Sequence, residues 1–242
     1  DCLLKSSESS RKAYEKTNES NLLLLQALCY CLAVDQYIEL EEYEKAIHYQ
    51  KKGVDILARE FYGSEYYWNN YEKLGLCFYY IGEHKMAYKI FTDCKDFYLS
   101  AEKTYDPYKV ADIYGKLVIC SQNFAEAISH AMMSLLIKKD GLNLEPEELC
   151  SDYVNLGLLY YKSSILSQAY YYYTRAEECY NEIKNPTRDQ LLAMGMLYNN
   201  IGNYFRRLGK YKEAIDYYNK SKDIKEQIVG VNHSSYANTL TS

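Results

Sequence analysis

The chain has 242 residues, of which 48% are hydrophobic and 25% charged, and this balance excludes a chain that is disordered throughout. Its formal net charge of −5 argues against a protein that holds nucleic-acid phosphates on a basic surface. The longest nearly apolar run, Leu22 to Val34, is shorter than the roughly 20 residues that cross a bilayer, so we expect no membrane span.

Residues 1–20 are polar and charged, but Leu3, Leu4, Ala13 and Tyr14 can line one side of a helix. We expect a capping helix, or the second half of a lost repeat, that packs against the first hairpin. A disordered tail is the alternative.

From residue 21 onward the sequence repeats. In each unit a small residue and an alanine stand twelve residues apart, and the first members of successive pairs are 40 to 45 residues apart. Valine replaces glycine in the first unit. The constant spacing indicates one structural element used five times. The pairs are Val34/Ala46, Gly75/Ala87, Gly115/Ala127, Gly157/Ala169 and Gly202/Ala214.

Aromatic residues keep fixed offsets within these units. In four units one ring precedes the small residue by four positions, and in four units another follows it by three, so both flank it on one helical face. Three units carry a further ring four residues after the alanine, at Phe91, Tyr173 and Tyr218. We interpret each unit as a helical hairpin in which the small residues let two helices approach and the rings fill the space on either side.

Proline and glycine mark the ends of the units. Three prolines precede a new first helix, where proline is tolerated, and Gly82 and Gly209 fall in turns inside hairpins. Strand patterning is absent, so the predicted fold is all-α. The expected units are residues 21–62, 63–104, 105–145, 146–185 and 186–230, followed at 231–242 by the start of a truncated sixth repeat.

This pattern resembles the tetratricopeptide repeat over roughly residues 21–229. The unit length of 40–45 residues and the Gly-x-x-His sequence at 230–233 are similar to the kinesin light chain type. The resemblance implies a right-handed α-solenoid of about five stacked hairpins. In such a superhelix the first helices line a concave groove that can hold a peptide.

The resemblance also implies which residues face the groove, because they flank the small residue on the side turned away from the second helix. Asparagine can grip a peptide backbone, and lysine and arginine bind carboxylates. We therefore expect a protein partner that presents an acidic or carboxylate-ended peptide; a merely solvated polar surface is the simpler interpretation. The expected peptide-binding residues are Lys73, Tyr80, Lys109, Lys116, Asn155, Lys162, Asn199, Asn200, Asn203, Arg206 and Arg207.

The eight cysteines form no Cys-x-x-Cys pair and do not combine with the four histidines at metal-ligand spacing. Most fall within apolar helical patterns, where a free cysteine acts as a small hydrophobic residue. We therefore expect reduced thiols, no bound metal and a cytoplasmic protein.

The sequence holds no phosphate-binding glycine-rich loop, no His-Glu-x-x-His and no Gly-x-Ser-x-Gly motif. We expect a non-catalytic protein–protein interaction module that needs no cofactor. The alternative is a helical regulatory or oligomerisation scaffold within a larger multidomain protein, such as an enzyme. In that case the groove is filled by the same chain or by a second copy, and homo-oligomerisation stays open.

Overall fold

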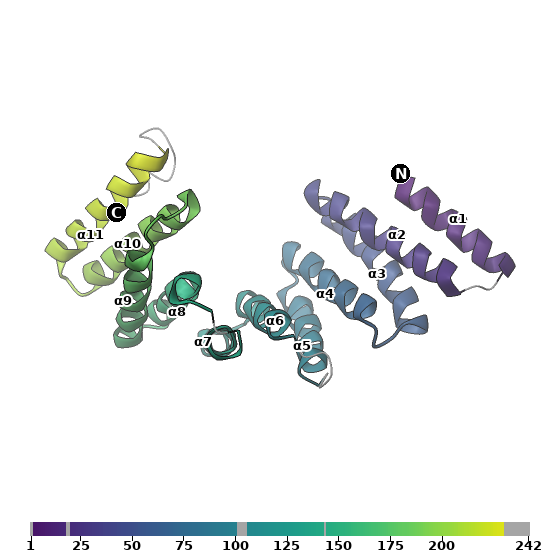
Figure 1. Ribbon diagram of the computed structural model, residues 1–242, viewed down its shortest axis with the longest axis horizontal. Coiled ribbons are helices and arrows are strands. Elements are labelled where there is room, and N and C mark those ends of the chain that lie inside the picture. The colour runs from purple at the N-terminus through teal and green to yellow at the C-terminus, as the bar shows by residue number, and fades with distance from the viewer. Residues whose placement is uncertain (1, 18–19, 101–105, 143, 230–242) are drawn as a thin grey trace. The chain divides into compact units, whose positions relative to one another are not determined.

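The computed structural model describes residues 2–17, 20–100, 106–142 and 144–229, and every regular element in these ranges is a helix (Figure 1). The predicted all-α fold is confirmed for these residues. The chain forms two compact units, residues 1–106 with 119–121 and residues 107–118 with 122–242. The expected sixth repeat at 231–242 lies outside the described residues.

The first unit is a run of helices in which each packs against the next (Figure 1). The expected units 21–62 and 63–104 each contain one helical pair, α2 with α3 and α4 with α5. The additional helix α1 packs against α2, which is the place of a capping helix. The helices are α1 (Cys2–Thr17), α2 (Ser20–Glu39), α3 (Tyr43–Glu60), α4 (Glu65–Tyr80) and α5 (His84–Ser100).

One helix of the described residues, α2, passes the test of length and composition for crossing a membrane, over Asn21–Glu39. The sequence expectation of no span rested on the shorter run Leu22 to Val34. In the structure α2 packs between α1 and α3, and Ala27 and Val34 are fully buried. Only 33% of this apolar window is buried, and Leu25 and Leu32 are exposed.

The second unit continues the alternation of first and second helices. A π-helical turn, Ile137–Gly141, and a 3₁₀ turn, Pro146–Leu149, lie between α7 and α8. A capping box of Thr187 and Gln190 begins α10. The helices are α6 (Pro107–Cys120), of which residues 107–118 belong to this unit, α7 (Phe124–Leu136), α8 (Cys150–Lys162), α9 (Leu166–Glu182), α10 (Arg188–Arg207) and α11 (Tyr211–Val229).

Four of the hairpin turns place the same repeat position, seven residues after the small residue, in the left-handed backbone region. Gly82 and Gly209 have φ of 82° and 73°, and Glu41 and Ser164 have φ of 58° and 65°. Glycine adopts this conformation at little cost, whereas other residues are strained in it. Glycine therefore marks two of these turns in the sequence, and only the repeat spacing marks the other two.

In three hairpins an aromatic ring of the second helix lies directly on the glycine of the first helix, sixteen residues earlier. A Cβ atom at Gly75 would lie 2.7 Å from Phe91, and one at Gly202 would lie 2.5 Å from Tyr218. At Gly157 a Cβ atom would overlap the fully buried ring of Tyr173. The glycine thus makes room for a ring, and not for the second backbone as the sequence analysis proposed.

The remaining two hairpins lack this contact because one partner differs. Sixteen residues after Gly115 stands Ala131, and no described atom lies within 4 Å of a Cβ built at Gly115. Sixteen residues after Val34 stands Gln50, and both side chains are fully buried. Each ring at this position therefore has a glycine beneath it, whereas the glycine at 115 stands without a ring.

The ring contact predicts opposite effects for the same substitution at two glycines of the second unit. Gly157→Ala forces a methyl group into Tyr173 and should destabilise the fold by about 1–3 kcal/mol. Gly115→Ala meets open space within a helix and should stabilise it by about 0.5–1 kcal/mol. Urea unfolding followed by circular dichroism measures both. Equal effects at the two positions would contradict the ring contact.

Tyrosine side chains form much of the core of the second unit. Tyr180 and Tyr198 are 6% and 7% exposed. Burial raises the pKa of both phenols to about 12, because the phenolate would lose its hydration, and burial also raises the pKa of Tyr173. An unfolded tyrosine titrates near pH ~10. The folded chain therefore retains these protons at a pH where the unfolded chain loses them.

This difference predicts alkaline unfolding. Below pH ~10 the buried tyrosines contribute fully to the free energy of unfolding. This free energy falls as the pH rises from about 10 to 12, because the unfolded state then binds fewer protons than the folded state. Phenolate absorbance and circular dichroism recorded in one titration test the expectation that buried tyrosines ionise together with the loss of helix. Ionisation of every tyrosine before any loss of helix would contradict it.

Candidate peptide-binding surface

The expected peptide-binding residues are divided between the two units. Lys73 and Tyr80 lie on α4 of the first unit, and the other nine lie on α6, α8 and α10 of the second. All eleven are on first helices of hairpins. Their partners within the chain differ, and these partners decide which side chains are available to a ligand.

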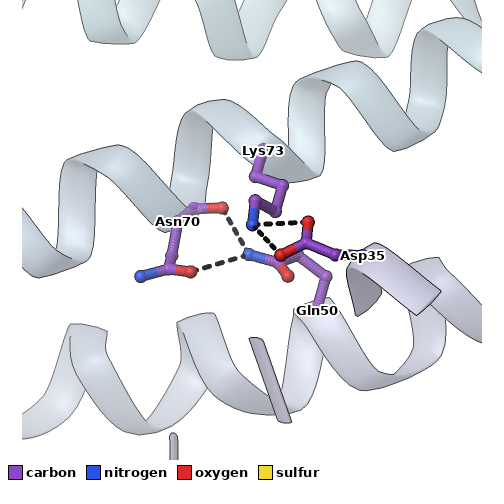
Figure 2. Close-up of polar contacts among 4 residues, drawn as sticks. All are labelled: Asp35, Gln50, Asn70 and Lys73. Carbon is purple, nitrogen blue, oxygen red and sulfur yellow. Dashed lines mark hydrogen bonds and ion pairs between the residues drawn. The ribbon is translucent and has the colours of Figure 1, made fainter. Parts of the chain in front are cut away.

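Lys73 already has a carboxylate partner. Its Nζ atom lies 2.7 and 3.0 Å from the two carboxylate oxygens of Asp35 on α2, as Figure 2 shows. Beside this pair the buried amide of Gln50 on α3 donates to the backbone oxygen of Asn70 at 2.7 Å and to its side-chain oxygen at 3.3 Å. These contacts link the first hairpin to the second. The ammonium group of Lys73 is therefore engaged in the packing of the first unit.

Three further residues of the expected set also have partners in the chain. The ring of Tyr80, which is 48% exposed, stacks on Tyr43 with centroids 5.3 Å apart. Lys116 pairs with Asp112 one helical turn earlier on α6. Lys109 lies half-buried on the same helix. The positive charge of Lys116 is therefore balanced locally.

On α10, three polar residues form one connected stripe at helical spacing. The Asn203 amide donates to Asn199 Oδ1 at 3.2 Å, and Arg206 donates to Asn203 Oδ1 at 3.3 Å. The hydroxyl of Tyr218 on α11 donates to the same Asn203 oxygen at 2.9 Å. Tyr218 is the residue whose ring lies on Gly202. The ring contact of the fifth hairpin thereby also orients the stripe.

Arg207 points toward the preceding hairpin. Its guanidinium donates to the backbone oxygen of Tyr161 at 3.0 Å and to Ser164 Oγ at 2.8 Å, and lies 5.3 Å from the centre of the Tyr161 ring. The Tyr161 hydroxyl donates in turn to the backbone oxygen of Asn203 at 3.3 Å. These contacts fasten α10 to the turn between α8 and α9, so Arg207 has a structural role.

The remaining members of the set are turned to solvent or half-buried. Arg206, Lys162 and Asn155 are exposed, and Asn199 and Asn200 are half-buried. Within the described ranges neither Arg206 nor Lys162 has a carboxylate partner. Both flank the residues that join α8 to α10, since Lys162 follows Tyr161 and Arg206 precedes Arg207. Two unbalanced cations and several amides therefore share one part of the second unit.

Sequence reasoning did not single out Tyr161, Ser164 or Tyr218 as parts of this surface. Tyr218 was recognised as an interior ring, but its hydroxyl contact depends on Asn203 following Gly202 directly. The described residues hold no group of three or more His, Cys, Asp or Glu side chains placed to bind a metal ion. All eight cysteines are free thiols, and seven of them are buried.

A family model of the tetratricopeptide repeat matches residues 147–227 and 193–242. Over the matched residues, 147–242, the chain is tetratricopeptide repeat. The hairpins before residue 147 repeat the same spacing and the same helical pairing. Comparison with curated proteins gives no match. Tetratricopeptide repeats are protein-interaction scaffolds and are generally non-catalytic.

Solved structures agree with this tetratricopeptide repeat assignment. BtubC (BKLC) from P. vanneervenii is 18% identical, with a TM-score of 0.71 over 96% of this chain and 92% of that chain. The TPR-like repeats of a Podosopora anserina protein assigned as a kinesin light chain are 12% identical, with a TM-score of 0.69 over 82% and 94%. The Rap conjugation gene regulator of plasmid pLS20, in complex with the Phr* peptide, is 18% identical, with a TM-score of 0.59 over 90% and 58%. Identities this low show a shared fold.

The two neighbouring arginines at the end of α10 should differ in their effect on stability. Arg207→Ala removes two hydrogen bonds between hairpins and should lower the free energy of unfolding by about 1 kcal/mol. Arg206→Ala removes one long hydrogen bond within α10 and should change it by less than about 0.5 kcal/mol. Urea unfolding of both variants measures the difference. A larger loss of stability for Arg206→Ala than for Arg207→Ala would contradict the structural role of the Arg207 contacts with Tyr161 and Ser164.

Proposed function

We propose that this chain binds an acidic or carboxylate-ended segment of another protein on the surface formed by α8 and α10 of its second unit. The observation that carries the proposal is the pair of exposed cations, Arg206 and Lys162, which have no carboxylate partner within the described ranges. Lys73 and Lys116, by contrast, have Asp35 and Asp112. In a chain with more acidic than basic residues, unbalanced cations on adjacent first helices favour an anionic ligand.

Asparagine side chains beside the cations supply the second element of recognition. Asn155, Asn199 and Asn200 offer donors and acceptors that match those of an extended peptide backbone. Asn203 is held by Tyr218, so part of the surface is ordered before a ligand arrives, which limits the entropy lost on binding. A peptide is also the ligand in the Rap–Phr* complex, a protein of similar fold.

Arg207 and Lys73 are secondary in this proposal, since each would have to leave its contacts within the chain to reach a ligand. The direct contacts fall instead to Arg206 and Lys162. Arginine can hold a carboxylate through two parallel hydrogen bonds, whereas lysine acts as a point charge. Arg206 is therefore the position at which substitution should affect binding most.

Reversing the charge at Arg206 tests the proposal. A peptide-library pull-down with wild-type protein should enrich sequences rich in Asp and Glu, and Arg206→Glu should weaken their binding by about tenfold while leaving the helical content unchanged. Binding to wild-type protein should also weaken with added salt, because the contact is exposed. Fluorescence anisotropy with one enriched peptide measures both effects.

Lys184→Glu is the matched control. It makes the same charge change on an exposed residue of the same unit, in the loop before α10, and should leave the affinity unaltered. Equal loss of affinity in both variants would mean a general electrostatic attraction. Unaltered binding by Arg206→Glu, or a library without acidic enrichment, would remove the proposal.

A further inference from the structure

A cleft with a volume of about 550 Å³ opens at one end of the α4–α5 hairpin in the first unit. Its described walls are mainly aromatic. They come from the loop before α4, from the first two turns of α4 and from the last turns of α5. The rings are those of Tyr62, Tyr67, Trp68, Tyr71 and Phe97.

Local structure places these rings together. The hydroxyl of Ser64 accepts the backbone N–H of Tyr67 and fixes the start of α4, so that Tyr67, Trp68 and Tyr71 follow within its first two turns. Because α4 and α5 are antiparallel, Phe97 near the end of α5 reaches the same place. Its ring stacks on Trp68 with centroids 4.4 Å apart. This stacked pair supports the cleft from the side of the core.

The remaining rings meet Trp68 at steep angles. The planes of Tyr67 and Tyr71 each lie at 77° to the indole, with centroids 5.0 and 5.9 Å away, and Tyr62 lies 5.0 Å from Tyr67 on the solvent side. Tyr67 and Tyr71 are nearly parallel to each other, with centroids 5.6 Å apart, so the rings of the cleft take two crossed orientations, an arrangement that suits a rounded cation. A flat guanidinium would stack on a single face, so this geometry favours an alkylammonium group.

Two carboxylates complete the lining. Asp93 accepts the Tyr71 hydroxyl at 3.1 Å through one oxygen, which leaves its other oxygen for a ligand, and Asp96 pairs with Lys95 at 3.1 Å. Among the described residues that line the cleft, none is Lys, Arg or His. The cleft therefore combines aromatic faces with negative charge, which is the combination that attracts an organic cation.

The indole N–H of Trp68 has no hydrogen-bond partner among the described residues. The side chain itself is buried, with 7% of the residue exposed. Buried polar groups of this kind are uncommon in cores built for stability alone. The Nε1 atom is itself buried, so Trp68 offers its ring and not this donor to the cleft.

We propose that this aromatic cleft binds the alkylammonium group of a lysine side chain, plain or N-methylated, on a partner protein. Tyr62, which is 70% exposed, and Asp96 stand at the solvent side, where a lysine side chain can enter from a polypeptide lying outside. The proposal is separate from the anion-binding surface on α8 and α10, because it concerns the other unit and a ligand of opposite charge.

The chain contains one tryptophan, so its fluorescence reports on this cleft alone. The probes are a short alanine peptide carrying one trimethyllysine, the same peptide with the uncharged tert-butyl isostere, the same peptide with plain lysine, and choline. We expect saturable changes with the charged peptides and at least about tenfold weaker binding of the isostere. We expect choline to bind more weakly than the trimethyllysine peptide.

Two variants and a control complete the experiment. Asp93→Asn keeps an acceptor for Tyr71 but removes the charge, and Tyr62→Ala removes an exposed ring without disturbing the core; each should weaken trimethyllysine binding several-fold. Asp55→Asn changes an exposed carboxylate on α3 of the same unit and should have no effect. Equal binding of the isostere, or unaltered binding by Tyr62→Ala, would overturn the proposal. Choline binding as tight as the peptide would overturn the assignment to a protein partner.

Discussion

Three hairpins of this chain close on the same contact, an aromatic ring laid on a glycine sixteen residues earlier. A close-packed interior tolerates neither an added methyl group nor a void at such a place. In the fifth hairpin the contact also orders a polar surface, because the Tyr218 hydroxyl reaches Asn203 from a ring seated on Gly202. In the fourth hairpin the hydroxyl of Tyr173 has no partner among the described residues. The same packing element thus also positions a polar surface in one hairpin, through a single neighbouring asparagine.

The fold could be predicted from the sequence because the same spacing of small and aromatic residues recurs in several units. The twelve-residue spacing identified each hairpin, and the ring four residues after the alanine identified the interior of three of them. The spacing could not show that the ring covers the glycine itself. It located the turns at Glu41 and Ser164 but could not show that a residue other than glycine adopts the left-handed conformation there.

The candidate site was only partly readable, because helical spacing fixes the face on which a side chain lies and not its partner. Lys73 and Arg206 are equivalent by that criterion, yet Asp35, 38 residues away in sequence, neutralises the first. Arg207 is adjacent to Arg206 but bonds to residues 43 and 46 positions earlier. Such contacts depend on how one hairpin stacks on the next. The aromatic cleft was missed for the same reason, since its walls come from two helices and the loop before the first of them.

The hairpin of α6 and α7 is the one whose glycine carries no ring, and its α6 is divided between the compact units, residues 107–118 in the second and 119–120 in the first. Cooperativity in a repeat array passes only between nearest neighbours, so a repeat without this contact is a place at which the array can divide. We therefore expect the two compact units to unfold as separate blocks, in which case no single transition temperature describes the chain.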